Sequence, residues 1–125
     1  MIDHTQTKER VILVAVSLDE SGHEDSTTEE SLLELAELVR TAGAETVGQI
    51  IQNRERIHPG TYVGTGKIEE IKDLAEELEA NGIVCDDELS PAQLRNLENA
   101  LEMKVMDRTM VILDIFATRA STREG

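Results

Sequence analysis

Three consecutive acidic residues at positions 86–88 follow a short apolar run that is typical of a buried strand. Immediately after them, Ser90 matches a helix N-cap, Pro91 the first helical residue, and Gln93 the second half of a capping box. Carboxylate oxygens bind divalent cations, but neighbouring residues on one turn seldom converge on one ion without distant ligands. We therefore expect no metal site here, and we interpret the cluster as a charged surface that also offsets the dipole of the following helix.

A glycine-rich segment at residues 60–67 has the residue types of a phosphate-binding loop. A Walker A motif is excluded, because five residues separate Gly60 from Gly66 and Ile68 stands where the magnesium-binding hydroxyl would be. A weaker anion site remains, in which backbone N–H groups and a lysine face the ligand at a helix N-terminus. The alternative is that the glycines only serve a tight turn. The residues of this candidate anion site are Tyr62, Gly64, Gly66 and Lys67.

The sequence contains no recognisable catalytic constellation. Its three histidines fall in predicted loops, and no Ser-His-Asp or Cys-His arrangement is visible. The single cysteine, Cys85, falls in a predicted strand, which favours a packing role over a nucleophilic one. Asp107 and Arg108 mark another strand-to-helix junction, where Asp107 is a candidate N-cap. We therefore expect a protein that is not catalytic by itself.

Composition limits the partners of the chain. Its 125 residues are enough for one domain, and the net charge of -14 argues against a nucleic-acid backbone or an anionic membrane as the main partner. Only Tyr62 and Phe116 are aromatic, so the stacking platform of single-strand nucleic-acid binders is absent. No apolar run approaches the length of a membrane span, and the start of the chain is polar, so we expect a cytoplasmic location.

The hydrophobic pattern predicts four strands that alternate with helices. The run at residues 10–18 is almost entirely apolar and β-branched, as in a strand buried on both faces of a parallel sheet. Alternation of this kind predicts an α/β fold, namely an open, mostly parallel sheet of about four strands with helices on both faces, built from βαβ repeats. The other predicted strands are 46–51, 83–85 and 104–106, and the helices are 27–43, one from about residue 68 to Asn81-Gly82, one following Ser90, and 108–120.

A parallel sheet gathers the segments that follow its strands along one edge. Residues 19–26, 52–66, 86–90 and 107–109 would share that edge, which makes it the best candidate site. We expect residues 1–9 to be a disordered lead-in and residues 10–125 to form one domain. Because the last residues are polar and uncapped, we also expect the chain to be a piece of a longer protein.

Three segments together resemble the N-terminal domain of the HflX family of ribosome-associated GTPases. These segments are TYVGTGKIEEIKDL, DDELSPAQLRNLENAL and VMDRTMVILDIFATRASTREG, and the resemblance covers roughly residues 10 to 125. It implies an α/β subdomain that is followed in the family by two long antiparallel helices and a Ras-like GTPase domain. The motifs of that GTPase domain are absent here, so GTP hydrolysis is carried over to no residue of this chain.

The resemblance further implies a parent protein that binds the 50S ribosomal subunit, hydrolyses GTP with Mg²⁺, and helps to split or rescue ribosomes. It also implies occasional binding of adenine nucleotides. We expect the carboxyl edge of the sheet to contact the ribosome or the protein's own GTPase and helical subdomains. The alternative is a stand-alone domain that binds ATP or GTP phosphates at residues 64–67. The expected contact residues are Asp86, Asp87, Glu88, Arg95, Asn96, Asp107 and Arg108.

Overall fold

The computed structural model of the chain describes residues 9–17, 26–53 and 59–115. The expected lead-in before residue 9, all three histidines and the end of the last predicted helix lie outside these residues. The elements in chain order are β1 (Arg10–Ser17), α1 (Ser26–Thr41), β2 (Glu45–Asn53), α2 (Thr65–Leu78), β3 (Gly82–Cys85), α3 (Pro91–Leu101) and β4 (Lys104–Asp107), and residues 108–115 are again helical.

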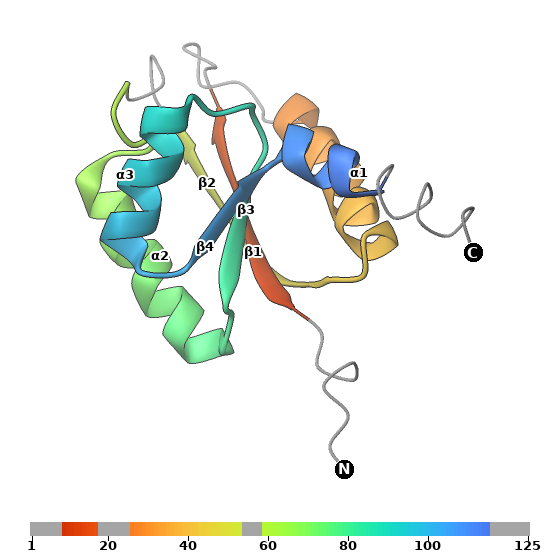
Figure 1. The fold of residues 1–125 in the computed structure, drawn as a ribbon, viewed down its shortest axis with the longest axis horizontal. Coiled ribbons are helices and arrows are strands. Elements are labelled where there is room, and N and C mark those ends of the chain that lie inside the picture. Colours follow the sequence, from red (N-terminus) through yellow and green to blue (C-terminus); the bar gives the residue numbers. More distant parts are fainter. Residues whose placement is uncertain (1–8, 18–25, 54–58, 116–125) are drawn as a thin grey trace.

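The strands form one parallel sheet in the order β2-β1-β3-β4, which confirms the predicted α/β fold. Figure 1 shows α2 and α3 on one face of the sheet, and α1 with the helical segment 108–115 on the other. The central strand β1 is buried along both faces, as its unbroken apolar run predicts. The chain moves from β1 to β2 on one side, and then crosses back to β3 on the other side of β1. The carboxyl ends of β1 and β3 are therefore the switch point, where open α/β sheets usually bind ligands.

Two aliphatic layers hold the helices to the sheet. Beneath α2 and α3, residues such as Ile12, Ile71 and Leu97 are fully buried, whereas Leu13, Leu35 and Val84 lie in the layer beneath α1. Alternate residues of β1 thus enter opposite layers, which follows from the two-residue period of a strand.

The helix ends agree with the predicted caps at most positions. Gly43 ends α1 with a φ of 99°, and at α3 the Ser90–Gln93 capping box is formed with Pro91 in the first turn. At α2 the structure differs slightly from the prediction, because the helix ends at Leu78, just before Asn81-Gly82. Glu79 adopts the left-handed conformation there, and the Arg10 guanidinium donates hydrogen bonds to the Leu78 and Glu79 carbonyl oxygens at 2.9 and 3.2 Å.

A substitution at Gly82 tests the close packing of β3 against β4. A Cβ atom at this position would lie 3.1 Å from the carbonyl oxygen of Lys104, which belongs to the neighbouring backbone and cannot rotate away. We expect Gly82→Ala to lower the free energy of unfolding by about 1–2 kcal/mol, measured by urea denaturation. Gly66→Ala is the matched control, since a Cβ at Gly66 would meet nothing within 4 Å. It should raise stability by about 0.5–1 kcal/mol through helix propensity, and equal effects of the two substitutions would contradict this packing.

Candidate functional site

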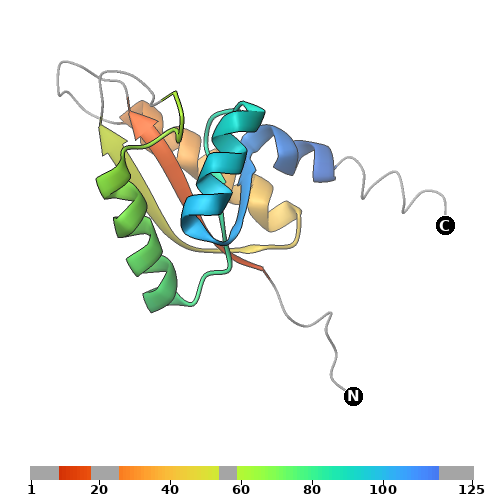
Figure 2. The same ribbon diagram turned by 60° about the vertical axis from the view of Figure 1, so that its left-hand side comes forward.

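The segments that follow the strands meet at the carboxyl edge of the sheet, as predicted. In Figure 2 the first turns of α2 and α3 lie at the same end of the sheet as the arrowheads of β1 and β2. The turn from β3 to α3 begins at the switch point, because the Asp86 N–H donates to the Val14 carbonyl of β1 at 2.8 Å. Asp86 and Asp87 in this turn bind different partners, whereas Glu88 is exposed.

The Asp86 carboxylate joins three elements through Arg108 and Ser31. Arg108 Nη2 donates to Asp86 Oδ1 at 2.8 Å, and Ser31 Oγ donates to Asp86 Oδ2 at 2.8 Å. Arg108 Nη2 also lies 2.9 Å from both the carbonyl oxygen and the hydroxyl of Ser31, and Nε donates to the Asp86 carbonyl at 3.3 Å. The two charged side chains are 24% and 11% exposed, so water screens this pair less than a surface pair. We call the three residues the Asp86–Ser31–Arg108 bridge.

Asp87 accepts a hydrogen bond from Tyr62 in the loop before α2. Tyr62 Oη lies 2.7 Å from Asp87 Oδ2, and the tyrosine is 1% exposed. Burial raises the pKa of Tyr62 far above its usual value, and the hydrogen bond to Asp87 and the charges of Asp87, Cys85 and Asp86 raise it further. The phenol therefore stays protonated and acts as a donor that fixes the loop, which is a structural role within the candidate anion site.

Asp107 is buried, with 2% exposure, and uses both carboxylate oxygens inside the domain. Oδ2 accepts the N–H of Leu89 at 2.8 Å, and Oδ1 accepts the N–H of Met110 at 2.9 Å. The predicted N-cap at Asp107 is thus confirmed. Because the side chain is enclosed, Asp107 supports the edge from within and offers no surface to a partner.

Of the expected contact residues, Glu88, Arg95 and Asn96 are exposed. The Asn96 side chain donates to the Gly60 carbonyl oxygen at 2.9 Å, so it also ties α3 to the loop before α2. No hydrogen bond or ion pair within the described part of the chain holds Glu88 or Arg95. Among the expected contact residues, these two charged side chains are therefore available for contact.

The glycines of residues 60–67 adopt conformations that other residues can also take. Gly64 is the N-cap of α2 with a φ of -72°, Gly66 lies in the first helical turn, and the positive φ of this loop falls on Tyr62, at 73°. A turn in this loop therefore does not depend on a glycine in the left-handed conformation. The Gly64 N–H is bonded to Gln52 Oε1 at 3.0 Å, and Lys67 Nζ pairs with Glu70 at 2.9 Å. The backbone N–H groups that could still bind an anion are those of the first turn of α2, which has no side-chain cap.

The titratable side chains of the described residues were compared with the needs of a metal site and of a nucleophile. Within the ranges that the structure describes, no three His, Cys, Asp or Glu side chains are placed to hold a metal ion. Cys85 is fully buried, and burial together with the charges of Asp107, Asp87 and Asp86 raises the pKa of its thiol well above the usual range. No helix in the described part is long and apolar enough to cross a membrane.

Sequence reasoning missed Ser31 and Gln52. Ser31 lies within α1, where a serine usually faces solvent, and its partner Arg108 is 77 positions further along the chain. Gln52 lies near the end of β2, and its amide oxygen accepts the Gly64 N–H. Only the assembled sheet brings Ser31 to Arg108 and Gln52 to Gly64, so no local sequence pattern could have identified these two residues.

Comparison with known proteins places the chain among GTPase N-terminal domains. A family model described as "GTP-binding GTPase N-terminal" matches residues 29–117. The chain is 70% identical to a GTPase HflX of Lacrimispora saccharolytica and 40% identical to one of Escherichia coli, and both similarities cover all 125 residues. It spans only 29% and 28% of the length of these two relatives. A GTP-binding protein of Sulfolobus solfataricus, solved in complex with GDP, shares the fold, with a TM-score of 0.59 and 20% identity over 89% of this chain and 30% of that protein.

Proposed function

The chain belongs to the family of GTPase N-terminal domains that occurs in HflX proteins, and on this basis we propose that it is a non-catalytic module of a GTPase that acts on ribosomes. In this proposal the full-length protein binds the 50S subunit in the cytoplasm and helps to split or rescue ribosomes. GTP and Mg²⁺ bind in the GTPase domain of that protein. The module contributes the carboxyl edge of its sheet as a contact surface. Through this surface, binding of the ribosome affects the GTPase and helical subdomains.

One observation carries this proposal most strongly: the side chains of the edge are fixed from inside the domain. The Asp86–Ser31–Arg108 bridge, the Tyr62–Asp87 hydrogen bond and the buried Asp107 hold three segments in place. Glu88 and Arg95 then stand exposed on this rigid support. A contact surface built in this way loses little conformational entropy when a partner binds.

The overall charge limits the kind of contact. A net charge of -14 repels the phosphate backbone of RNA over most of the surface of this chain. The edge is therefore expected to meet a protein surface or the rest of its own protein, while other parts of the GTPase make most of the RNA contacts. Arg95 is an exposed cation at the described part of the edge and can contribute to either contact.

We test this with a full-length HflX protein that carries this domain. The double substitution Glu88→Ala/Arg95→Ala removes one exposed acid and one exposed base of the edge and leaves the net charge unchanged. The control, Glu9→Ala/Lys104→Ala, removes one acid and one base at the opposite edge, where they pair with each other at 2.8 Å. We expect the first variant to lose about tenfold in 50S-stimulated GTP turnover with basal turnover intact, which corresponds to about 1.4 kcal/mol, and the control to match the wild type. Equal turnover in both variants would contradict the proposal.

The second candidate function is a weak nucleotide-binding domain that holds phosphates at Gly64, Gly66 and Lys67. The observation in its favour is the uncapped N-terminus of α2 with Lys67 beside it. Calorimetric titration of the 125-residue chain with ATP and with GTP tests it. Binding that Lys67→Ala abolishes and Lys72→Ala preserves would support this function, and the absence of heat at millimolar nucleotide would exclude it.

A further inference from the structure

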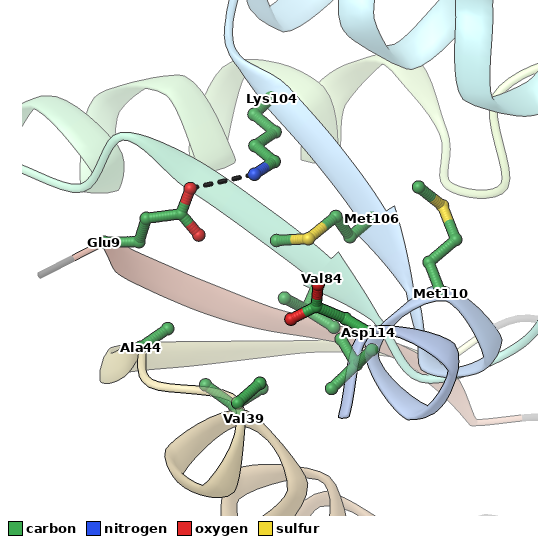
Figure 3. Close-up of a pocket in the computed structure, with 10 residues that line it drawn as sticks. Glu9, Val39, Ala44, Val84, Lys104, Met106, Met110 and Asp114 are labelled. Atoms are coloured by element: carbon green, nitrogen blue, oxygen red, sulfur yellow. Dashed lines mark hydrogen bonds and ion pairs between the residues drawn. The ribbon is translucent and has the colours of Figure 1, made fainter. Parts of the chain in front are cut away.

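The two outer strands of the sheet, β2 and β4, differ in how their free sides are protected. β4 has only four residues, begins with a lysine and ends with the buried Asp107. Figure 3 shows the Lys104 side chain directed at Glu9, with which it forms an ion pair at 2.8 Å. Short length and charged side chains are the usual means by which a protein keeps other strands from pairing with an outer strand. The free side of β4 is therefore protected.

The free side of β2 lacks these features. The strand has nine residues, and the eight from Thr46 to Asn53 include no charged side chain and no proline. It pairs with β1 on one side, and within the described ranges no strand pairs with its other side. Val47 has no partner in β1, so a bulge disturbs the strand near its amino end. The regular part that is open to a further strand is thus Gly48–Asn53, with Gln49 exposed in it.

A depression of about 280 Å³ lies between α1 and the amino-terminal part of β2. The hydroxyl oxygen of Thr46 is buried at this depression and has no hydrogen-bond partner among the described residues. A donor supplied by another molecule would remove the cost of leaving this hydroxyl unpaired. The residues that line the depression are Ala36, Glu37, Arg40, Ala44, Glu45 and Thr46.

Helix α1 presents an apolar side chain on the side of this depression. Leu33 is 70% exposed, and its spacing from Ala36, Glu37 and Arg40 places the four residues on one face of the helix. This face carries one acid and one base, whose side chains lie 2.6 Å apart. Two copies of the face in antiparallel orientation can therefore bring opposite charges together and cover both leucines.

We propose that β2 forms the interface of a symmetric dimer, in which Gly48–Asn53 of two copies pair as antiparallel strands around a two-fold axis. Residues near such an axis meet their own copies, so a charge there would face a like charge. The lack of charge from Thr46 to Asn53, in a chain with 30% charged residues, is what this pairing requires. The two sheets become continuous, and α1 of each copy lies on the same face. The proposal does not rest on the proposed function, which uses the carboxyl edge.

Sedimentation velocity of the 125-residue chain over a range of concentrations tests this association. We expect the mass to rise from 13.8 kDa toward twice that value at high micromolar concentration. The net charge of -14 on each copy opposes the association, so added salt should strengthen it by screening this repulsion. A chain that stays monomeric at millimolar concentration in high salt would overturn the proposal.

Gln49→Lys tests whether β2 is the interface. It makes the net charge less negative but places like charges close to the two-fold axis, so we expect it to weaken the dimer about tenfold. Asn99→Lys is the matched control, because it adds the same charge at an exposed position of α3. It should leave the dissociation constant unchanged or lower it. Equal dissociation constants in the two variants would contradict pairing through β2.

Leu33→Ala is the second variant, and it is used if circular dichroism shows that Gln49→Lys does not fold. It leaves the strand intact and removes the exposed leucine of α1. We expect it to weaken the dimer about tenfold, because each copy loses an apolar side chain that the association buries. Unchanged association in this variant would then count against the dimer.

Discussion

Tyr62 is expected to keep its proton until the protein unfolds. Burial and the hydrogen bond to Asp87 raise its pKa in the folded state above the ordinary value of about 10. The folded state therefore holds this proton more tightly than the unfolded state does. The stability that results is fully present below about pH 10 and is lost progressively as the pH rises above that value.

The ionisation of Tyr62 can be followed by absorbance without interference from other tyrosines, because Tyr62 is the single tyrosine of this chain. The phenolate absorbance should appear together with the loss of helical circular dichroism in an alkaline titration, and near pH 10 in the urea-unfolded chain, about its ordinary pKa. Tyr62→Phe should be about 1 kcal/mol less stable near neutral pH, because one hydrogen bond is lost. It should then lose less stability in alkali, with Cys85 accounting for the dependence that is left. A native protein whose tyrosine ionises near pH 10, about the ordinary value, while the fold persists would contradict the buried Tyr62–Asp87 pair.

Asp107→Ala is expected to be among the most destabilising single substitutions at the edge. It leaves the N–H groups of Leu89 and Met110 without their acceptors, and Leu89 is itself buried. Hydrogen bonds to a charged group contribute about 1.5–3 kcal/mol each, so we expect a loss of about 3 kcal/mol in the free energy of unfolding, measured with urea.

Two controls separate this effect from general damage to the helical segment 108–115. Asp107→Asn keeps one acceptor oxygen and should lose less than the alanine variant. Asp114→Ala changes an exposed carboxylate further along the same segment and should stay within about 0.5 kcal/mol of the parent chain. If Asp107→Ala were no more costly than Asp114→Ala, the buried capping role of Asp107 would be wrong.

The fold could be predicted from the sequence because its signals are local. The apolar run of β1, the Ser90 capping box and the alternation of strands and helices each point to a parallel α/β sheet. α2 ends slightly before the predicted position, where Glu79 adopts the left-handed conformation and Arg10, far away in the sequence, contacts the carbonyl oxygens of Leu78 and Glu79. The helix propensities of neighbouring residues cannot predict a contact with Arg10, which lies far away in the sequence.

The candidate site could be located from the sequence but its internal contacts could not. Parallel strands alone bring the acidic turn, the glycine loop and the Asp107–Arg108 junction to one edge. Which side chains meet there depends on the strand order, and this decides that Ser31 reaches Arg108 and that Tyr62 reaches Asp87. The positive φ of Tyr62 was missed for a related reason, since a buried hydrogen bond holds a conformation that its residue type disfavours.

Hydrogen exchange measured by mass spectrometry tests the central claim most directly, on a full-length HflX protein with and without 50S subunits. The claim is that the carboxyl edge is the surface of this domain that ribosome binding engages. We predict slower exchange of the backbone amides at residues 86–90 and in the first turn of α3 when the 50S subunit is added, with no change at residues 102–104 on the opposite edge. Unchanged exchange at residues 86–90, or slowing confined to residues 102–104, would contradict the account.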